Sequence, residues 1–458
     1  MSFGGYLYRK NRVVGQKTYW KCCLHNDKVV QCRGNAIFEL VDEVEKLRSS
    51  TLHNHAPDPE TRETKIAVSH LKEKARSTQN KPCQLINDLK IGLDQDINLP
   101  SDRALAKIIY RTRKIEIAEP TPLDFELDEG YKRLDIGENF LISDLRADGR
   151  NIIFGTLQSL QILARSTMWI MDGTFKTCPS LFSQIYSIHG VIKTDSSTVC
   201  IPCIYMLMSS KSESSYKTVF QEILVAAQSY GVILKPRFIM TDFETGAINA
   251  CKSIFRPQKH RCCFFHFGQI VFRKVQELGL KSRYAKDIGF SLSIKKLVAL
   301  AFLEAHEIYR AFEECRALTD VPEIIAFLDE NYINGKIVGY RSNGIPMRSP
   351  PRYPPALWTV SDLVSSELPR TQNFIEGWHN RLANLTGAHH IPVYRFIDAI
   401  KKESHTSALN FNNFIRGISK PIDKKYRDRE ERIKRVLRNR NVLSYQEFLY
   451  GIACNLSL

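Results

Sequence analysis

The stretch that decides the fold runs from Pro236 to Phe267, PRFIMTDFETGAINACKSIFRPQKHRCCFFHF. Its hydrophobic pattern predicts a short buried strand that ends at Asp242, then a helix, a second strand and a helix that opens with a histidine. The segment from Arg237 to Thr241 is mostly apolar, as expected of a central strand covered on both faces, so Asp242 falls where that strand leaves the sheet. A carboxylate in this position can bind a metal ion.

Two further acidic residues occupy comparable positions. Asp172 follows the apolar strand Met168-Trp169-Ile170-Met171, and Glu376 lies in the first turns of a helix predicted for RTQNFIEGWHNR, residues 370–381. Three carboxylates on three elements can hold two divalent cations about 3.5–4 Å apart, the arrangement that cleaves phosphodiesters. Oxygen ligands favour Mg²⁺ or Mn²⁺. We therefore predict that Asp172, Asp242 and Glu376 are catalytic residues and magnesium ligands.

Each acid also has an ordinary structural interpretation. An Asp before a Gly is common in turns, which describes Asp172, and Asp242 is suitably placed to cap a helix that begins near Glu244. Glu376 competes with Glu367 for the third position, and an exposed glutamate on a helix is usually only solvated. Taken together with the order of the predicted strands, the three acids favour a catalytic site.

The motif Cys263-Phe264-Phe265-His266 follows the second predicted strand. We expect His266 to be polar and near the acids, bonded to a substrate phosphate or to a carboxylate, and we include it among the catalytic residues. Cys263 can coordinate a metal, orient the site or pack as a small apolar residue. Cys200 and Cys203 have the spacing of a zinc pair, but no second pair follows them, so we interpret them as core residues.

These residues resemble a known family. Asp172 in MDGTFKTCP, Asp242 in TDFE, the Cys-x-x-His motif and Glu376 in RTQNFIEGWHNRL are similar to the Asp-Asp-Glu domain of Mutator-like (MULE) transposases, over roughly residues 150 to 390. The resemblance implies an enzyme that cuts and joins strands of double-stranded DNA, at the element ends and at the target. By analogy we expect a homo-oligomer, and DNA as the substrate implies a nuclear location.

The predicted order of elements agrees with this resemblance. Three strands, a helix, a strand, a helix, a strand and a helix follow each other from about Met168 onwards. This is the order of a ribonuclease-H-like α/β fold, in which the first and fourth strands are neighbours. Asp172 and Asp242 are therefore expected to lie side by side.

Residues 1–58 carry a separate metal-binding pattern. Cys22 and Cys32 are followed by the closely spaced His53 and His55, in a segment too small for a large core, which predicts a tetrahedral zinc site on a small antiparallel sheet. Cys23 competes with Cys22, although the spacing from the preceding tryptophan favours Cys22. The module resembles the FLYWCH zinc finger, with Leu7, Tyr8, Trp20, Cys22, Cys32, His53 and His55 on its pattern and Phe3 or Tyr6 at its first position. Such fingers bind DNA or protein.

Residues 59–118 show helical periodicity, with Pro82 and Ser101 as helix starts. The last predicted helix ends Tyr110-Arg111-Thr112-Arg113-Lys114, and short helices with a basic final one resemble a helix-turn-helix DNA-binding module. A helical bundle with a solvated basic face fits equally well, because basic residues at a helix end are also favoured by the helix dipole.

The other segments complete the predicted organisation. We expect a linker at residues 119–150, the nuclease domain at 151–390 with a helical insertion at about 280–365, and a basic helical region at 391–458. The insertion ends in a proline-rich aromatic segment, where Tyr353 or Trp358 either stacks on a base or, as we favour, packs in the core.

The composition fits an intracellular protein that binds a polyanion. The 458-residue chain has a formal net charge of +16, which by itself does not distinguish DNA from a membrane surface or an acidic protein. No secretory signal opens the chain and no apolar stretch is long enough to span a bilayer, so we expect no membrane partner and interpret the 12 cysteines as thiols or metal ligands. Lys420 to Arg440 carries ten basic and four acidic residues, which suits contacts with phosphates or a solvated helix.

The sequence thus predicts a DNA transposase that binds element ends and catalyses metal-dependent strand cleavage and strand transfer. Its cofactors are expected to be Zn²⁺ in the N-terminal module and Mg²⁺ or Mn²⁺ at the acids. A transposase-derived transcription regulator, which binds DNA without catalysis, is the main alternative. A nuclease that cuts DNA without joining it is the second.

Overall fold

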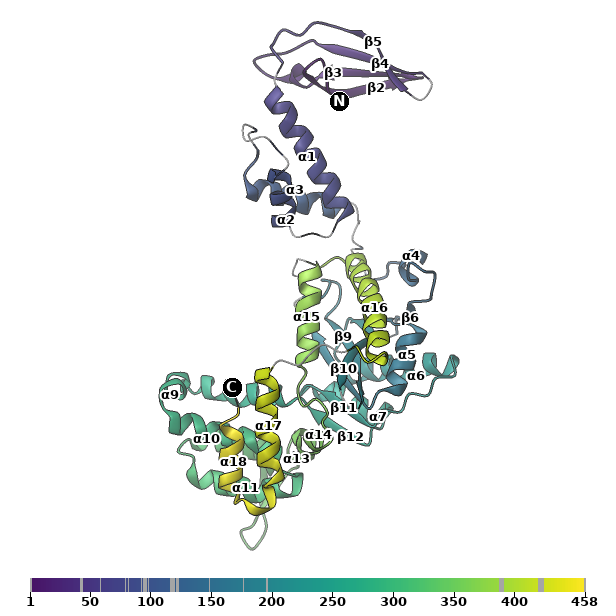
Figure 1. Ribbon diagram of the computed structural model, residues 1–458. Helices are drawn as coiled ribbons and strands as arrows, with labels where there is room; N and C mark the ends of the chain where they lie inside the picture. Colours follow the sequence, from purple (N-terminus) through teal and green to yellow (C-terminus); the bar gives the residue numbers. More distant parts are fainter. Residues whose placement is uncertain are drawn as a thin grey trace. The chain divides into compact units, whose positions relative to one another are not determined.

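The structure is a computed structural model of the 458-residue chain (Figure 1). It describes residues 2–456 except 42–43, 58, 79, 81, 92, 94–96, 98, 116–119, 121–122, 148, 176, 195–196, 387–390 and 419–423. The chain divides into two compact units, Met1–Ala118 and Glu119–Leu458, and each is described by itself. The predicted boundary between residues 118 and 119 lies outside the described residues, as does the start of the basic segment at Lys420.

The first unit begins with an antiparallel sheet, which confirms the β-rich module predicted from the sequence (Figure 1). Its strands pair in chain order: β1 Ser2–Phe3, β2 Tyr6–Val14, β3 Lys17–Cys22, β4 Asn35–Val41 and β5 Val44–Ser50. Its buried apolar core consists of Tyr8, Ala36 and Phe38. So small a core stabilises little on its own, and domains of this size usually need a metal.

Helices make up the rest of the first unit. They are α1 Pro59–Ser77, α2 Pro82–Ile91 and α3 Asp102–Ile115. Leu71, Leu85 and Ile109 belong to the core that they share. Ser101 precedes α3 and accepts a hydrogen bond from the Ala104 amide at 3.4 Å, as an N-cap does.

The second unit is built around a mixed sheet whose order is β12-β11-β8-β9-β10-β7-β6. The strands are β6 Leu141–Leu145, β7 Asn151–Phe154, β8 Met168–Thr174, β9 Gln184–Lys193, β10 Thr198–Met208, β11 Phe238–Thr241 and β12 Lys259–Cys262. β8, β11 and β12 are parallel, and the other neighbours are antiparallel. β8 and β11 are therefore direct neighbours, as the predicted strand order requires.

Helices cover both faces of this sheet (Figure 1). On one face lie α5 Leu157–Arg165, α6 Glu213–Ser229 and α7 Thr245–Ile254; on the other lie α8 Phe264–Glu277, α15 Asn373–Thr386 and most of α16 Val393–Ile415. Strand β8 shows the division, because Trp169 packs on the first face while Met168 and Ile170 pack on the second. Side chains that alternate in this way make a strand buried on both faces.

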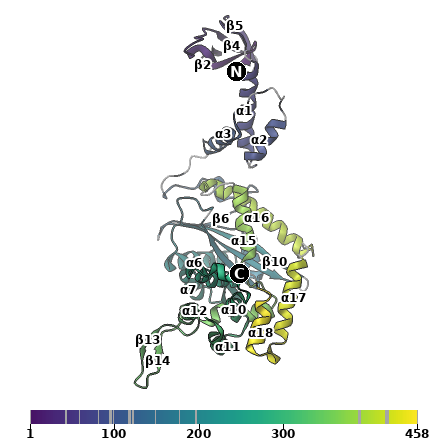
Figure 2. The same cartoon turned by 90° about the vertical axis from the view of Figure 1, so that its left-hand side faces the viewer.

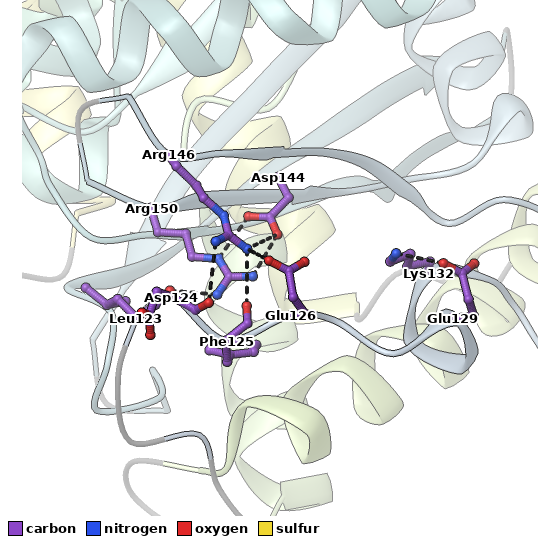
Figure 3. A network of polar contacts seen from close by, with 9 residues as sticks. All are labelled: Leu123, Asp124, Phe125, Glu126, Glu129, Lys132, Asp144, Arg146 and Arg150. Carbon is purple, nitrogen blue, oxygen red and sulfur yellow. Dashed lines mark hydrogen bonds and ion pairs between the residues drawn. The ribbon is translucent and has the colours of Figure 1, made fainter.

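The segment 119–150 is not the linker that we expected. It contains α4 Glu129–Lys132 and the edge strand β6, and the buried side chains of Leu134 and Phe140 join the main core. Tyr131 stacks on Tyr394 of α16 with 4.4 Å between centroids. Within the segment, Arg150 ties the two ends together: its guanidinium pairs with Asp144 at 2.7 Å and donates to the Leu123 carbonyl at 2.6 Å (Figure 3). Packing between residues far apart in the chain cannot be predicted from the local sequence of a segment rich in loop-forming residues.

The segment between α8 and α15 is mainly helical, with a β-hairpin in addition. It comprises α9 Lys281–Lys286, α10 Ile288–Ala299, α11 Ala305–Leu318, α12 Pro322–Leu328, β13 Ile337–Tyr340, β14 Pro346–Arg348, α13 Pro355–Trp358 and α14 Ser361–Ser365. Tyr353 and Trp358 are buried, so they pack rather than offer a surface for bases.

The C-terminal helices α17 Lys424–Arg438 and α18 Tyr445–Ala453 complete this part of the unit. α18 packs on α10 and α11, and α16 packs on β10, so residues 391–458 do not form a region apart. Among the described residues, no helix combines the length and the apolar character needed to cross a bilayer.

Candidate functional site

Asp172 and Asp242 project from neighbouring strands onto the same face of the sheet. The pairing of β8 with β11 aligns Met168 with Phe238 and Ile170 with Met240, and continuing that register places Asp172 level with Asp242. Because side chains alternate along a strand, both acids share the face that α8 and α15 cover. Asp172 lies inside β8, which continues to Thr174, so the interpretation of this residue as part of an Asp-Gly turn is wrong.

Asp172 is buried and Asp242 partly buried, with other acidic groups nearby. Burial raises the pKa of Asp172, and the charge of Asp242 raises it further, with smaller contributions from Glu376 and Glu244. Burial also raises the pKa of Asp242, which His266 and Lys211 oppose. Asp242 still accepts a hydrogen bond from the Glu244 amide at 3.3 Å, so it shapes the turn into α7 as well.

Glu376 reaches the same pocket from the first turn of α15. His379, three residues further along the same helix, lies 3.9 Å from Asp172, so this side of α15 faces the sheet. The charge of Glu376 also contributes to the raised pKa of Asp172. Glu367, the alternative, is engaged elsewhere. It forms ion pairs with Lys193 at 3.0 Å and Lys434 at 2.6 Å, and these cations lower its pKa to about 2.

The Cys-x-x-His motif lies at the start of α8. His266 faces the acids: burial lowers its pKa, while Asp242 and Glu376 act in the opposite direction. Cys263 is fully buried, its sulfur accepts a hydrogen bond from the Gln372 amide at 3.4 Å, and burial raises the pKa of its thiol to about 12. A thiol that stays protonated packs and orients rather than binds a metal.

Two residues of this pocket escaped the sequence interpretation as site residues. The buried Gln372 donates from Nε2 to the carbonyl of Met171 at 2.7 Å, and its own carbonyl accepts the Glu376 amide at 3.0 Å, so it fixes α15 to β8. His379 places Nδ1 3.9 Å from a carboxylate oxygen of Asp172, and burial lowers its pKa to about 4. The spacing of His379 from Glu376 was the available signal, because residues three apart share a helix face.

A second site lies in the first unit, where Cys22, Cys32, His53 and His55 meet. Their ligand atoms all lie within 4.8 Å of one another. Each sulfur is 3.3 Å from a histidine nitrogen, Cys22 from Nε2 of His55 and Cys32 from Nδ1 of His53, and the two nitrogens are 3.4 Å apart. In a tetrahedral zinc site with ordinary bond lengths, a sulfur and a nitrogen ligand are about 3.6 Å apart and two nitrogen ligands are about 3.3 Å apart. The donor set therefore fits zinc, with Cys22 rather than Cys23 as the ligand.

Neighbouring groups orient the two histidines. The Tyr8 hydroxyl is hydrogen-bonded to Nε2 of His53 at 2.7 Å, and Nδ1 of His55 is 2.8 Å from the Ala56 carbonyl. Tyr6 stacks on the His53 ring with 3.7 Å between centroids. Gly34 also approaches His53 so closely that an added Cβ would stand 2.5 Å from Cε1 of the ring. Contacts of this kind fix the ring orientation that a metal needs.

Comparison with known families agrees with both sites. Residues 168–269 match the MULE transposase domain. Residues 1–55 match the FLYWCH zinc finger domain. The two resemblances that the sequence predicted are thereby confirmed, and together they indicate a transposase-type DNA-binding protein. No protein in the curated set matches the chain.

The MULE match contains Asp172, Asp242, Cys263 and His266, whereas Glu376 lies beyond its end. Among the described residues, the Cys/His cluster is the one group of three or more such side chains whose ligand atoms all lie within 4.8 Å of one another. The acids of the MULE domain are thus spaced more widely than the ligands of a single tetrahedral ion. Two cations about 3.5–4 Å apart are bound by ligands that lie further from one another than the ligands of a single ion do.

The chemistry of the acidic pocket suits a divalent cation. Burial raises the pKa of both carboxyl groups, and the charge of Asp242 adds to the raised pKa of Asp172, so a bound cation would stabilise their ionised forms. Carboxylate oxygens are the ligands that Mg²⁺ and Mn²⁺ prefer. The assignment of Asp172, Asp242, Glu376 and His266 as catalytic residues stays a prediction.

Proposed function

We propose that this protein is a DNA transposase of the MULE type, with a ribonuclease-H-like catalytic core. The order β8, β9, β10, α6, β11, α7, β12 and α8, with β8 parallel to β11 and antiparallel to β9, supports this fold. The FLYWCH module and the helices of the first unit would hold the element ends. A nuclear location and a homo-oligomeric assembly belong to the same proposal, as does double-stranded DNA as the partner at both the ends and the target.

One observation carries the catalytic part of the proposal. Asp172 on β8 and Asp242 at the end of β11 stand level on neighbouring strands, and His379, three residues after Glu376 on α15, lies 3.9 Å from Asp172, so acids far apart in the chain approach one face of the sheet. Burying like charges together is costly, and structures that do so usually use the charges for chemistry. The match of residues 168–269 to the MULE transposase domain supports the reaction class that we propose for these acids, phosphodiester hydrolysis and transesterification.

The residues of the pocket would divide the work. When bound, Mg²⁺ or Mn²⁺ activates a water or a 3′ hydroxyl and stabilises the leaving oxygen. Asp172 and Asp242 would bind the cations from the sheet, and Glu376 from the opposite helix. Gln372 holds that helix against β8 and so keeps Glu376 directed at the pocket. His266, whose pKa is lowered by burial, would hydrogen-bond a phosphate oxygen or a carboxylate.

The test separates binding from cutting. The zinc-loaded full chain is incubated with a duplex that carries the inverted terminal sequence found beside similar open reading frames, with or without added Mg²⁺, and binding and nicking are scored independently. Wild type should nick and join only with Mg²⁺. Asp172→Asn should bind as wild type does but lose nicking by at least about 100-fold, because it removes a ligand charge.

The exposed Asp135 provides the matched control, since Asp135→Asn makes the same chemical change on the surface of the same unit. It should leave nicking unchanged. Nicking by Asp172→Asn at the wild-type rate would remove this residue from the catalytic set. If the wild-type protein binds the duplex but does not nick it, the alternative of a transcription regulator is favoured. If it nicks the duplex but gives no joined products, a simple nuclease is favoured.

A further inference from the structure

The hairpin β13–β14 exposes apolar side chains on a strand pair that has no core of its own. The exposed fractions are 46% for Ile337, 67% for Val338, 65% for Tyr340, 51% for Ile345 and 43% for Met347. Figure 2 shows the hairpin projecting beyond the neighbouring helices α11 and α12. Two-stranded hairpins are marginally stable alone, and clustered exposed apolar side chains usually mark a surface that binds a partner.

The hairpin is nevertheless well ordered at both ends. At the tip, the Arg341 amide donates to the Ile345 carbonyl at 2.8 Å, and the Gly344 amide donates to the Arg341 carbonyl at 2.9 Å. At the base, Arg348 pairs with Asp329 at 3.2 Å and donates to the Gly335 carbonyl at 2.7 Å. Gly335 has a φ of +87°, and a Cβ there would stand 1.7 Å from the Ser349 carbonyl oxygen, so the base requires glycine. A partner would therefore meet a preformed arm.

The charge of the arm is entirely positive. Residues 331–361 contain no acidic residue, while Lys336, Arg341, Arg348 and Arg352 are basic. Arg348 is used at the base, but Lys336, Arg341 and Arg352 are exposed. Charge complementarity therefore favours a polyanion, and it disfavours a second copy of a chain whose formal net charge is +16.

The base of the arm is joined to the loop that carries Asp242. The Tyr353 hydroxyl donates to the Phe243 carbonyl at 2.7 Å, and the two rings pack edge to face with 5.0 Å between centroids. Arg352 donates from Nη2 to the Thr245 hydroxyl at 3.1 Å. The position of the arm is thus fixed relative to a predicted catalytic carboxylate, through contacts within three residues of it.

We propose that the β13–β14 hairpin is a DNA-binding arm, which enters a groove of the duplex beside the strand that the acidic pocket cuts. A two-stranded ribbon fits the major groove, whose depth is about 8.5 Å. The four residues of β13 extend about 13 Å at the usual rise per residue, so the hairpin is long enough to reach the floor of the groove. Lys336 and Arg341 contact phosphates, while Val338 and Tyr340 contact sugars and base edges. This inference rests on the proposed function, since it takes DNA as the substrate.

The test measures the affinity of the full chain for a mixed-sequence duplex by fluorescence anisotropy, over about 50–200 mM salt. Lys336→Ala with Arg341→Ala should lower the slope of log K against log salt by about 1.8, which is two phosphate contacts at about 0.9 each. Val338→Ser with Tyr340→Ser should weaken binding about tenfold at every salt concentration, because these side chains release no counterions. All four side chains are exposed, so neither pair should alter folding.

A control pair, Arg165→Ala with Lys235→Ala, removes the same charges from exposed positions elsewhere in the unit and should leave the slope closer to wild type. Hairpin variants that bind with wild-type affinity and slope would overturn the arm while leaving the proposed function intact. Loss of self-association by these variants in sedimentation, with DNA binding unchanged, would overturn it in favour of a contact between copies. A wild-type chain that binds no DNA would overturn the proposed function and the arm with it.

Discussion

Replacing Gly34 with alanine should expel His53 from the zinc site of the first unit. The alanine Cβ would stand 2.5 Å from Cε1 and 2.6 Å from Nδ1 of the ring. Carbon atoms in contact are about 3.5–4.0 Å apart, so the ring would move by about 1 Å, whereas a zinc–ligand distance tolerates about 0.2 Å. A structural zinc site is worth about 10–16 kcal/mol, and an equal share for one of four ligands is about 2.5–4 kcal/mol. Zinc affinity should therefore fall about 100- to 1000-fold.

The assay is competition for zinc between the full chain and a chromophoric chelator at neutral pH. Gly130→Ala serves as the control, because a Cβ at Gly130 meets nothing within 4 Å and the same methyl group is added far along the chain. Cys32→Ser gives the loss expected when a ligand itself is removed. If Gly34→Ala held zinc as tightly as wild type, the close approach of Gly34 to His53 would not limit the site and the reasoning from this contact would fail.

Three further outcomes follow from buried groups. With zinc bound and no Mg²⁺ or Mn²⁺ added, Asp172→Asn should raise the free energy of unfolding of the second unit at pH 7 by more than about 1 kcal/mol and have no effect in acid. The reason is that a carboxyl group whose folded pKa is raised costs stability only once the pH rises above its unfolded pKa; urea titrations at several pH values check this. Gln372→Ala should cost about 1–3 kcal/mol in the same titration, since the Met171 carbonyl loses its donor in the core. Arg150→Met should cost about 1–3 kcal/mol, because Asp144 keeps only Arg146, at 3.8 Å, and the Leu123 carbonyl loses its donor. An equal loss in Asp144→Asn with no further loss in the double variant would show that the pair acts as a unit.

The parts that local sequence pattern determines were predictable. The zinc ligands could be predicted because short-range spacing and residue type define them, and the structure brings Cys22, Cys32, His53 and His55 together as expected. The apolar runs that precede Asp172 and Asp242 could also be recognised in the sequence, because a buried strand is a short continuous apolar segment. The pairing of β8 with β11, which sets Asp172 beside Asp242, was expected because the order of elements resembles that of a ribonuclease-H-like fold.

The parts that depend on packing between distant segments were not predictable in the same way. Nothing near Phe140 in the sequence indicates that it is buried in the core of the second unit, so the segment 119–150 was misinterpreted as a linker. Gln372 has its partner Met171 two hundred residues away. The close contact of Gly34 with His53 exists only once the sheet and the loop that carries the ligands have folded against each other.

The central claim is that Asp172, Asp242 and Glu376 hold a pair of divalent cations, and the most direct measurement is Mn²⁺ binding. Electron paramagnetic resonance of free Mn²⁺, titrated against the zinc-loaded full chain, counts the bound ions without requiring activity. Wild type should bind two ions, and Asp172→Asn or Glu376→Gln should weaken or remove at least one, whereas Glu367→Gln should not. Equal Mn²⁺ binding by wild type and by both site variants would contradict the account.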